Sequence, residues 1–207
     1  MKQVKVKICG VQTIDAARVV VSAGADYLGL IFVPTSKRFI SPDQAKKIIS
    51  EVKNDITIVG VFQGEELEKV LKLREELRFD YVQLHGDENR DYIKQLGGNI
   101  IKARRVTAED SSDAIITSLM QFKTEFALVD RDQGESDTLA SVTIAPVARR
   151  LRFFFAGGLT PENVAEKVRE VKPYAVDVSS GVETIGQKDR NKIEKFIRLA
   201  KEATYVA

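Results

Sequence analysis

The sequence has few of the residues on which metal centres and disulfide-bonded folds depend. Its 207 residues include one cysteine, one histidine and no tryptophan. One cysteine cannot form an internal disulfide, and one cysteine with one histidine argues against a zinc site. We therefore expect no bound metal.

Long apolar runs and an excess of one charge are also missing. No hydrophobic run approaches the roughly 20 residues that a membrane-spanning helix needs. The first residues lead into a strand pattern instead of a signal peptide. Lys and Arg total 32 against 30 Asp and Glu, and this balance argues against a nucleic-acid groove as the main surface. We expect a cytoplasmic enzyme with no membrane or nucleic-acid partner.

The sequence does contain a repeated unit, in which a β-rich run is followed by a turn and an amphipathic segment. It recurs eight times, at a mean spacing of roughly 25 residues that fits one βα unit. The expected strands are 4–9, 27–32, 57–62, 81–84, 100–103, 126–130, 152–156 and 175–179. The expected helices are 14–23, 65–78, 90–96, 111–122, 141–151, 164–171, 189–202 and one that begins after an N-cap at Ser41, with Pro42 at its first position and Gln44 at the capping-box position.

Eight such units without an interruption favour a single-domain (β/α)8 barrel of the α/β class over residues 1–207. Several expected strands, such as 28–32 and 153–156, are almost continuously apolar, which is typical of parallel strands covered by helices. No linker, low-complexity tract or change of composition divides the chain. A length of 207 residues is at the short end for this barrel, and an open doubly wound sheet is the structural alternative.

In a barrel, chemistry takes place at the carboxyl ends of the strands, and two proton-transfer groups stand at such ends. Cys9 closes the first expected strand and precedes Gly10, which allows close approach of a ligand. A thiol here can serve as a general base if its pKa falls, although a lone cysteine on a strand is usually a small buried hydrophobe. Asp130 follows an apolar run, where it is either a proton donor or a helix cap or salt-bridge partner.

Two glycine-containing segments follow the seventh and eighth expected strands. Gly157 and Gly158 expose backbone N–H groups next to the start of a helix, and Ser180 and Gly181 occupy the same place one strand later. Many barrels bind phosphate with these two loops. A single Gly-Gly pair is often only a turn, but the two segments together predict a phosphate site.

Two further side chains, Asp177 and Arg38, are candidates with an alternative interpretation each, and the only histidine, His85, is not selected. Asp177 alternates with valines that face the helices, so it points into the barrel, either toward a ligand or toward Lys7 on the neighbouring strand. Arg38 suits a bidentate grip on a carboxylate but is also an ordinary solvated loop charge. His85 follows the fourth strand, and a lone histidine is more often structural than catalytic.

Taken together, these residues resemble those of the phosphoribosylanthranilate isomerase family of tryptophan biosynthesis. The matching segments run from the first expected strand to the last: KICG at 7–10, PTSKRFISP at 34–42, QLHGDE at 83–88, AGGLTPENV at 156–164 and AVDVSSGVETIGQKD at 175–189. Each segment alone is unspecific, whereas the combination is highly specific. The resemblance implies an aldose–ketose isomerase that performs an Amadori rearrangement of N-(5'-phosphoribosyl)anthranilate, a small phosphorylated substrate, with no cofactor and no metal.

The resemblance also implies a role for each candidate residue. Asp130 would be the general acid that protonates the furanose ring oxygen, and Cys9 would be the general base that removes the proton from C2. Arg38 would hold the anthranilate carboxylate, and Asp177 would lie near the anthranilate nitrogen. The phosphate would be bound by backbone and hydroxyl donors of Gly157, Gly158, Ser180 and Gly181.

One segment departs from the family pattern. After the aspartate of the sixth strand the family usually carries a glycine-rich stretch, but in residues 131–138 only Gly134 remains, with Glu135 and Asp137 nearby. Two carboxylates that pointed toward a phosphate would repel it. Two other functions stay open: the analogous isomerase of histidine biosynthesis or a bifunctional form, and a phosphate-binding barrel without catalysis. The sequence is compatible with a monomer or a homodimer.

Overall fold

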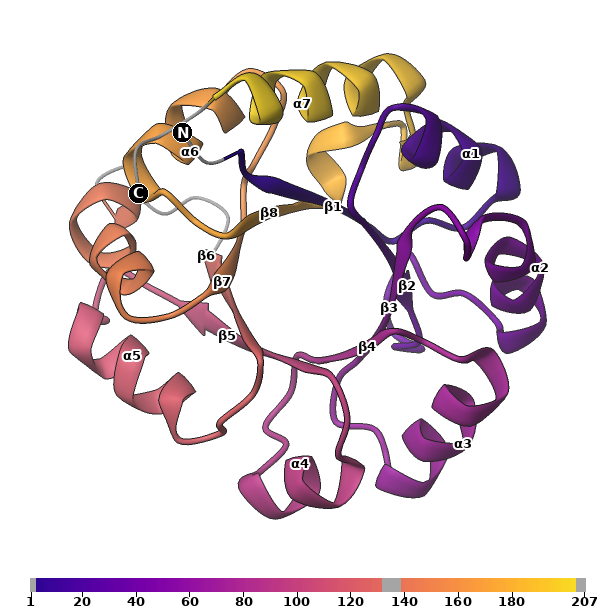
Figure 1. Cartoon of the computed structure of the whole chain (residues 1–207), viewed down its shortest axis with the longest axis horizontal. Helices are drawn as coiled ribbons and strands as arrows, with labels where there is room; N and C mark the ends of the chain where they lie inside the picture. Colours follow the sequence, from indigo (N-terminus) through magenta and orange to yellow (C-terminus); the bar gives the residue numbers. More distant parts are fainter. Residues whose placement is uncertain (1–2, 132–138, 204–207) are drawn as a thin grey trace.

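The computed structural model describes residues 3–131 and 139–203, in which eight parallel strands form a closed barrel (Figure 1). Neighbouring strands follow the chain order, and the last strand pairs with the first. The strands are β1 (Lys5–Cys9), β2 (Tyr27–Ile31), β3 (Thr57–Phe62), β4 (Tyr81–Leu84), β5 (Ile100–Val106), β6 (Phe126–Arg131), β7 (Phe153–Ala156) and β8 (Ala175–Val178). The predicted (β/α)8 barrel is confirmed, and the closure excludes an open doubly wound sheet, which keeps two free edges.

Helices surround the barrel on the outside (Figure 1). They are α1 (Ile14–Ser22), α2 (Pro42–Val52), α3 (Leu67–Leu77), α4 (Arg90–Leu96), α5 (Ser112–Met120), α6 (Val164–Val171) and α7 (Arg190–Glu202). Ser41 caps α2 as predicted, because its Oγ accepts a hydrogen bond from the Gln44 N–H at 3.3 Å. The Gln44 side chain does not complete the capping box, because it donates to the carbonyl of Gln12 at 2.5 Å. No helix in the described ranges has the length and apolar character needed to cross a membrane.

The helix predicted at 141–151 is wrong in type. This stretch contains a π-helical turn, η1 (Leu139–Ile144), followed by a 3-10 helix, η2 (Ala145–Arg149), in place of a regular α-helix. Pro146 is the physical reason, because a proline ring fixes φ and leaves no N–H for the carbonyl four residues earlier. A proline is tolerated in the first turn of a helix, and Pro146 takes that place in η2.

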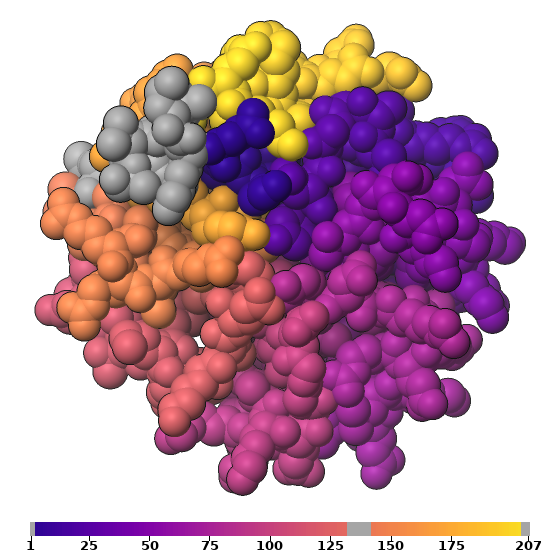
Figure 2. Space-filling view, viewed as in Figure 1, coloured from indigo at the N-terminus to yellow at the C-terminus, as the bar shows by residue number. Residues whose placement is uncertain are grey.

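The interior of the barrel is filled by aromatic side chains near the amino ends of the strands. The ring of Phe154 lies 5.0 Å from that of Tyr27 and 5.5 Å from that of Phe126, and Phe126 stacks on Tyr174 at 4.7 Å. In the space-filling view, atoms fill the centre of the ring of helices (Figure 2). This aromatic plug closes one end of the barrel and leaves the carboxyl ends of the strands as the side for a ligand.

The register between the first and last strands fixes which side chains meet inside the barrel. Lys7 on β1 is paired with Asp177 on β8. Val6 and Val176 alternate with them and pack in the core between the sheet and the helices. Cys9 has the same parity as Lys7 and packs against the side chains inside the barrel. The predicted inward direction of Asp177 therefore follows from the strand period of two.

Phe154 offers a test of the aromatic plug. Its side chain is fully buried, and truncation leaves a cavity in a close-packed interior. We expect Phe154→Ala to lower the free energy of unfolding, measured by chemical denaturation, by about 3–5 kcal/mol. The exposed Met120 on α5 is the control, since Met120→Ala should change this free energy by less than about 0.5 kcal/mol. A loss in Phe154→Ala no larger than that of the control would contradict the plug.

Candidate active site

A cavity of about 200 Å³ lies at the carboxyl ends of the strands. It is lined by seven of the eight residues that the sequence predicts for the site: Cys9, Asp130, Gly157, Gly158, Asp177, Ser180 and Gly181. The thiol of β1 and the carboxyl of β6 therefore face one pocket, together with the two glycine-containing segments. The eighth residue, Arg38, lies outside the lining of this cavity.

Cys9 is the last residue of β1, and only 6% of its surface is exposed. Gly29 on β2 lies beside it: a Cβ at this position would come within 2.7 Å of the Cys9 sulfur. Burial raises the pKa of the thiol, the positive charge of Lys7 acts against this rise, and the negative charge of Asp177 adds to it. The net direction is upward, which is the opposite of the fall that a base at neutral pH calls for.

Asp130 lies on β6 and contacts a histidine that the sequence reasoning did not select. Asp130 Oδ2 lies 3.2 Å from His85 Nε2, and His85 Nδ1 lies 3.4 Å from the side-chain nitrogen of Gln83. This arrangement fits an imidazole that accepts a hydrogen bond from Gln83 and donates one to Asp130. The signal was present in the sequence, because His85 follows β4 at the same end of the barrel as the other candidates.

The segment after β4 is fixed by a buried ion pair. Lys102 on β5 lies 2.8 Å from Glu88, which also accepts hydrogen bonds from the backbone N–H groups of Gly64 at 2.9 Å and Gly86 at 3.1 Å. Both charged side chains are almost fully buried. These contacts hold the loop that carries His85. A larger cavity of about 780 Å³ begins here and shares His85 with the smaller one.

Lys7 and Asp177 form the ion pair that was the alternative to a ligand role for Asp177. The Lys7 ammonium lies 2.9 Å from Asp177 Oδ2, and neither side chain is more than 8% exposed. The other carboxylate oxygen, Oδ1, is buried and has no hydrogen-bond partner among the described residues. One oxygen of Asp177 is thus used by the ion pair, and the residue also lines the cavity.

Arg38 is held at the rim of the barrel by a carboxylate 145 positions further along the chain. Its Nε and Nη2 groups donate to the two oxygens of Glu183, each at 2.7 Å, and Lys188 donates to the same carboxylate at 2.7 Å. Glu183 and Lys188 belong to a short antiparallel hairpin after β8, formed by β9 (Glu183–Thr184) and β10 (Gln187–Lys188). We call these three side chains the rim cluster.

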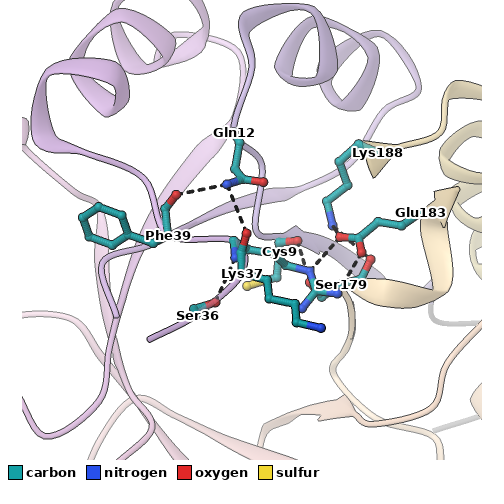
Figure 3. Close-up of polar contacts among 9 residues, drawn as sticks. Cys9, Gln12, Ser36, Lys37, Phe39, Ser179, Glu183 and Lys188 are labelled. Carbon is teal, nitrogen blue, oxygen red and sulfur yellow. Dashed lines mark hydrogen bonds and ion pairs between the residues drawn. The ribbon is translucent and has the colours of Figure 1, made fainter. Parts of the chain in front are cut away.

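A chain of hydrogen bonds links this hairpin to Cys9 (Figure 3). Lys188 also donates to the carbonyl of Ser179 at 2.9 Å, and the Ser179 hydroxyl donates to the carbonyl of Cys9 at 3.1 Å. The backbone of Cys9 is therefore tied to the hairpin that positions the arginine. Glu183 and Lys188 are not among the residues that the sequence predicts for the site, although both lie in the last of the segments that carry the family resemblance.

The rim cluster keeps a net charge of +1, since it contains two cations and one carboxylate. Burial by itself raises the pKa of Glu183, but the hydrogen bonds from Arg38 and Lys188 outweigh burial, and the pKa lies below its usual value. For Lys188, burial has the largest effect, and it lowers the pKa of the ammonium group. Arg38 Nη1 has no hydrogen-bond partner among the described residues, so one side of the guanidinium is available for an anion.

The two glycine-containing segments need glycine for geometric reasons. Gly157 has a φ of +94°, and a Cβ there would lie 1.9 Å from the carbonyl oxygen of Arg131. A Cβ on Gly181 would lie 1.8 Å from the carbonyl oxygen of Leu159. Any larger residue at either position would push the backbone apart. Glycine at these positions lets the neighbouring backbones approach closely at the wall of the pocket.

Two polar side chains support the first of these segments. Asn163 donates to the carbonyl of Gly158 at 2.9 Å and accepts from the N–H of Thr160 at 2.8 Å. The Arg131 guanidinium lies beside Gly158, because its Nη2 is 2.9 Å from where a Cβ would stand. The rest of the atypical loop, 132–138, lies outside the described residues. In the part of the chain that is described, no group of three or more His, Cys, Asp or Glu side chains can hold a metal ion.

The sequence matches the family model described as N-(5'-phosphoribosyl)anthranilate (PRA) isomerase over residues 6–199. This chain belongs to the phosphoribosylanthranilate isomerase family. An N-(5'-phosphoribosyl)anthranilate isomerase from Trichlorobacter lovleyi is 42% identical over 203 residues, which cover 97% of this chain and 99% of the relative. Another from Bacillus cereus is 39% identical over 207 residues, with the same coverage of both chains.

Solved structures of phosphoribosylanthranilate isomerases have the same fold. The enzyme from Thermotoga maritima matches with a TM-score of 0.87 at 36% identity, over 96% of this chain and 99% of that one. A phosphoribosylanthranilate isomerase in complex with reduced 1-(o-carboxyphenylamino)-1-deoxyribulose 5-phosphate matches with a TM-score of 0.86 at 38% identity and the same coverage. The family and the fold that the sequence predicts are therefore confirmed.

In this isomerase, the Glu183 carboxylate offers a test of the rim cluster. Glu183→Gln leaves two cations facing each other, so we expect it to lower the free energy of unfolding by about 1–3 kcal/mol at neutral pH. Because folding lowers the pKa of Glu183, its contribution is present above the unfolded value of 4.5 and is lost as the pH falls below it. Denaturation of both proteins across this range measures the difference, and a difference that does not change with pH would contradict the cluster.

Proposed function

We propose that this chain isomerises N-(5'-phosphoribosyl)anthranilate to 1-(2-carboxyphenylamino)-1-deoxyribulose 5-phosphate, with Asp130 as general acid and Cys9 as general base. The observation that carries the assignment of residues is a single cavity that contains a thiol, a carboxyl and two glycine segments suited to phosphate. Membership of the isomerase family supports the reaction itself. The reaction is the Amadori rearrangement of tryptophan biosynthesis.

The rearrangement needs one proton given and one proton taken. Protonated Asp130 gives its proton to the furanose ring oxygen as the bond from C1 to that oxygen breaks, and the anthranilate nitrogen supplies the electron pair that forms a protonated Schiff base. The Cys9 thiolate then takes the proton from C2, and the electrons of the C–H bond neutralise the Schiff base to give an enolamine. The enolamine tautomerises to the ketone. Asp130 ends as a carboxylate and Cys9 as a thiol, so one proton must pass from Cys9 back to Asp130 before the next turnover.

Each part of the substrate has a candidate partner in the pocket or, for Arg38, at the rim of the barrel. The anthranilate carboxylate would bind the Nη1 side of Arg38, which the contact with Glu183 leaves available. The anthranilate nitrogen would donate to Asp177 Oδ1, the buried oxygen that has no partner among the described residues. The phosphate would bind donors of Gly157, Gly158, Ser180 and Gly181.

Two competing functions predict different results with the purified protein. The analogous isomerase of histidine biosynthesis uses an aspartate on the first strand where this chain has Cys9, and a barrel without catalysis would bind the substrate without converting it. We expect turnover of phosphoribosylanthranilate, followed by fluorescence, and no turnover of the histidine-pathway substrate. Binding in a calorimeter without turnover would favour the barrel without catalysis.

The assembly and the cellular location also belong to this proposal. A phosphoribosylanthranilate isomerase from Thermotoga maritima is described as dimeric. For this chain we propose a monomer or a homodimer that acts in the cytoplasm. Light scattering of the purified protein at several concentrations decides between the two states of assembly.

The two proton-transfer residues are tested by substitutions that keep their size. We expect Cys9→Ser and Asp130→Asn each to lower kcat/KM for phosphoribosylanthranilate by about 10²–10⁴-fold, because each removes one proton transfer. Circular dichroism should show that both variants keep the fold. Asp55→Asn is the control, since Asp55 is exposed in the turn before β3 at the other end of the barrel. Near-wild-type rates in both site variants would reject the assignment.

The role of Arg38 is tested by a substitution that keeps its charge. Lysine has a single ammonium nitrogen and cannot hold Glu183 with one edge of a planar group while it offers another edge to the substrate carboxylate. We therefore expect Arg38→Lys to lower kcat/KM by about 10–100-fold, mainly through KM. Phosphoribosylaniline, which has no carboxylate, provides the control substrate. If Arg38 binds the carboxylate, the variant should lose little with this analogue. An equal loss with both substrates would contradict that role.

A further inference from the structure

Lys7 is completely buried, although an ammonium group is costly to remove from water. Its Nζ lies 2.9 Å from Asp177 Oδ2. Burial by itself lowers the pKa of this ammonium, but the charges of Asp177 and Cys9 outweigh burial, and the pKa lies above its usual value. Lys7 is therefore a fixed positive charge at neutral pH.

Gly29 allows the Lys7 ammonium and the Cys9 sulfur to lie together. A Cβ on Gly29 would stand 2.7 Å from the sulfur and 3.2 Å from Lys7 Nζ. Both groups therefore use the space that a side chain at this position would fill. They come from neighbouring inward positions of the same strand, β1. The geometry brings a permanent cation next to the only thiol of the chain.

Charged and titratable groups lie around Cys9 on several of the strands and loops that surround it. They are Lys7 on β1, Asp177 on β8, Lys188 on β10, Arg38 in the loop after β2, and Asp130 and His85 across the cavity on β6 and after β4. Among those that lower the pKa of the thiol, Lys7 has the largest effect and Lys188 a smaller one. Asp177 acts in the opposite direction.

We propose that Lys7 is a positioning residue for the isomerisation: its buried ammonium stabilises the Cys9 thiolate that removes the C2 proton, while Asp177 balances Lys7 with one oxygen and faces the substrate nitrogen with the other. The role of the thiolate rests on the proposed function. The pairing of ammonium and thiolate, in contrast, is a property of the free protein. Lys7 stays protonated throughout and exchanges no proton with the substrate.

The two charges of the pair match the two charges that form in the reaction. After ring opening, the substrate nitrogen is positive and the Cys9 sulfur is negative. Asp177 faces the first charge, and Lys7 lies beside the second. Removal of the C2 proton neutralises both charges together. The pair therefore stabilises the ionic state from which the proton is taken, and it does so in an interior where screening by water is weak.

The single cysteine makes this proposal measurable without a label. The thiolate is the nucleophile in alkylation, so the rate with iodoacetamide across pH reports the thiolate fraction of Cys9 in the free protein. We expect Lys7→Met to move this profile to higher pH by about one unit, which makes alkylation about tenfold slower at neutral pH. Asp177→Asn should move the profile to lower pH, because it removes the charge that opposes the thiolate.

A matched control and a double variant keep the test decisive. Lys167 on α6 is also buried and pairs with Glu170 on the outside of the barrel, so Lys167→Met should leave the profile of Cys9 unchanged. The double variant Lys7→Met/Asp177→Asn removes both charges of the ion pair, so neither is left unpaired. It takes the place of Lys7→Met in the test if that single variant does not fold. It should alkylate about tenfold more slowly than Asp177→Asn alone.

A second readout is the pH profile of kcat/KM, whose ascending limb should move to higher pH in Lys7→Met by the same amount as the alkylation profile. Equal alkylation profiles in Lys7→Met and the wild type, or in the double variant and Asp177→Asn, would overturn the proposal. Failure of the wild type to convert phosphoribosylanthranilate would overturn the proposed function alone, because alkylation needs no substrate.

Discussion

The ion pair of Lys7 and Asp177 joins the first and last strands where the barrel closes, and the candidate site is arranged around it. A buried ion pair adds little net stability to the fold, because the free energy needed to remove two charges from water is about as large as the attraction between them. Nearer the amino ends of the strands, the interior is filled by aromatic rings such as those of Phe126 and Phe154. These rings carry no charge and need no ionic partner when they are buried. The pair is therefore better explained by the chemistry of the site than by the stability of the fold.

The ion pair and the rim cluster differ in net charge. This difference suits a substrate with an anionic group at each end. Lys7 and Asp177 cancel each other beside the thiol, so neither end of the substrate is drawn toward the reacting carbons. The rim cluster of Arg38, Glu183 and Lys188 keeps one positive charge for a carboxylate. The glycine segments offer main-chain groups for a phosphate. In the proposed function, the substrate would be held at its ends while proton transfer takes place between them.

The sequence could predict what depends on strand parity and on the ends of strands. Cys9 and Asp130 line one cavity because each stands at the carboxyl end of a parallel strand, and closure of the barrel brings these ends together. Contacts made by side chains in the loops between strands and helices left no periodic signal. The pairing of Arg38 with Glu183 spans 145 positions and depends on a hairpin too short to recognise. The segment 141–151 has helical periodicity, but the local effect of a proline overrides that pattern.

Burial has two opposite effects on Cys9. Removal of the thiol from water raises its pKa, which makes the thiolate scarcer at neutral pH. The same loss of water strengthens the field of each neighbouring charge, so an ammonium beside the sulfur acts with little screening. A more exposed thiol would ionise more easily, but it would lose this field and leave the Schiff base open to hydrolysis. In the proposed mechanism, a permanent cation beside the sulfur is what allows a buried thiol to act as the base, and the missing side chain of Gly29 gives both groups room.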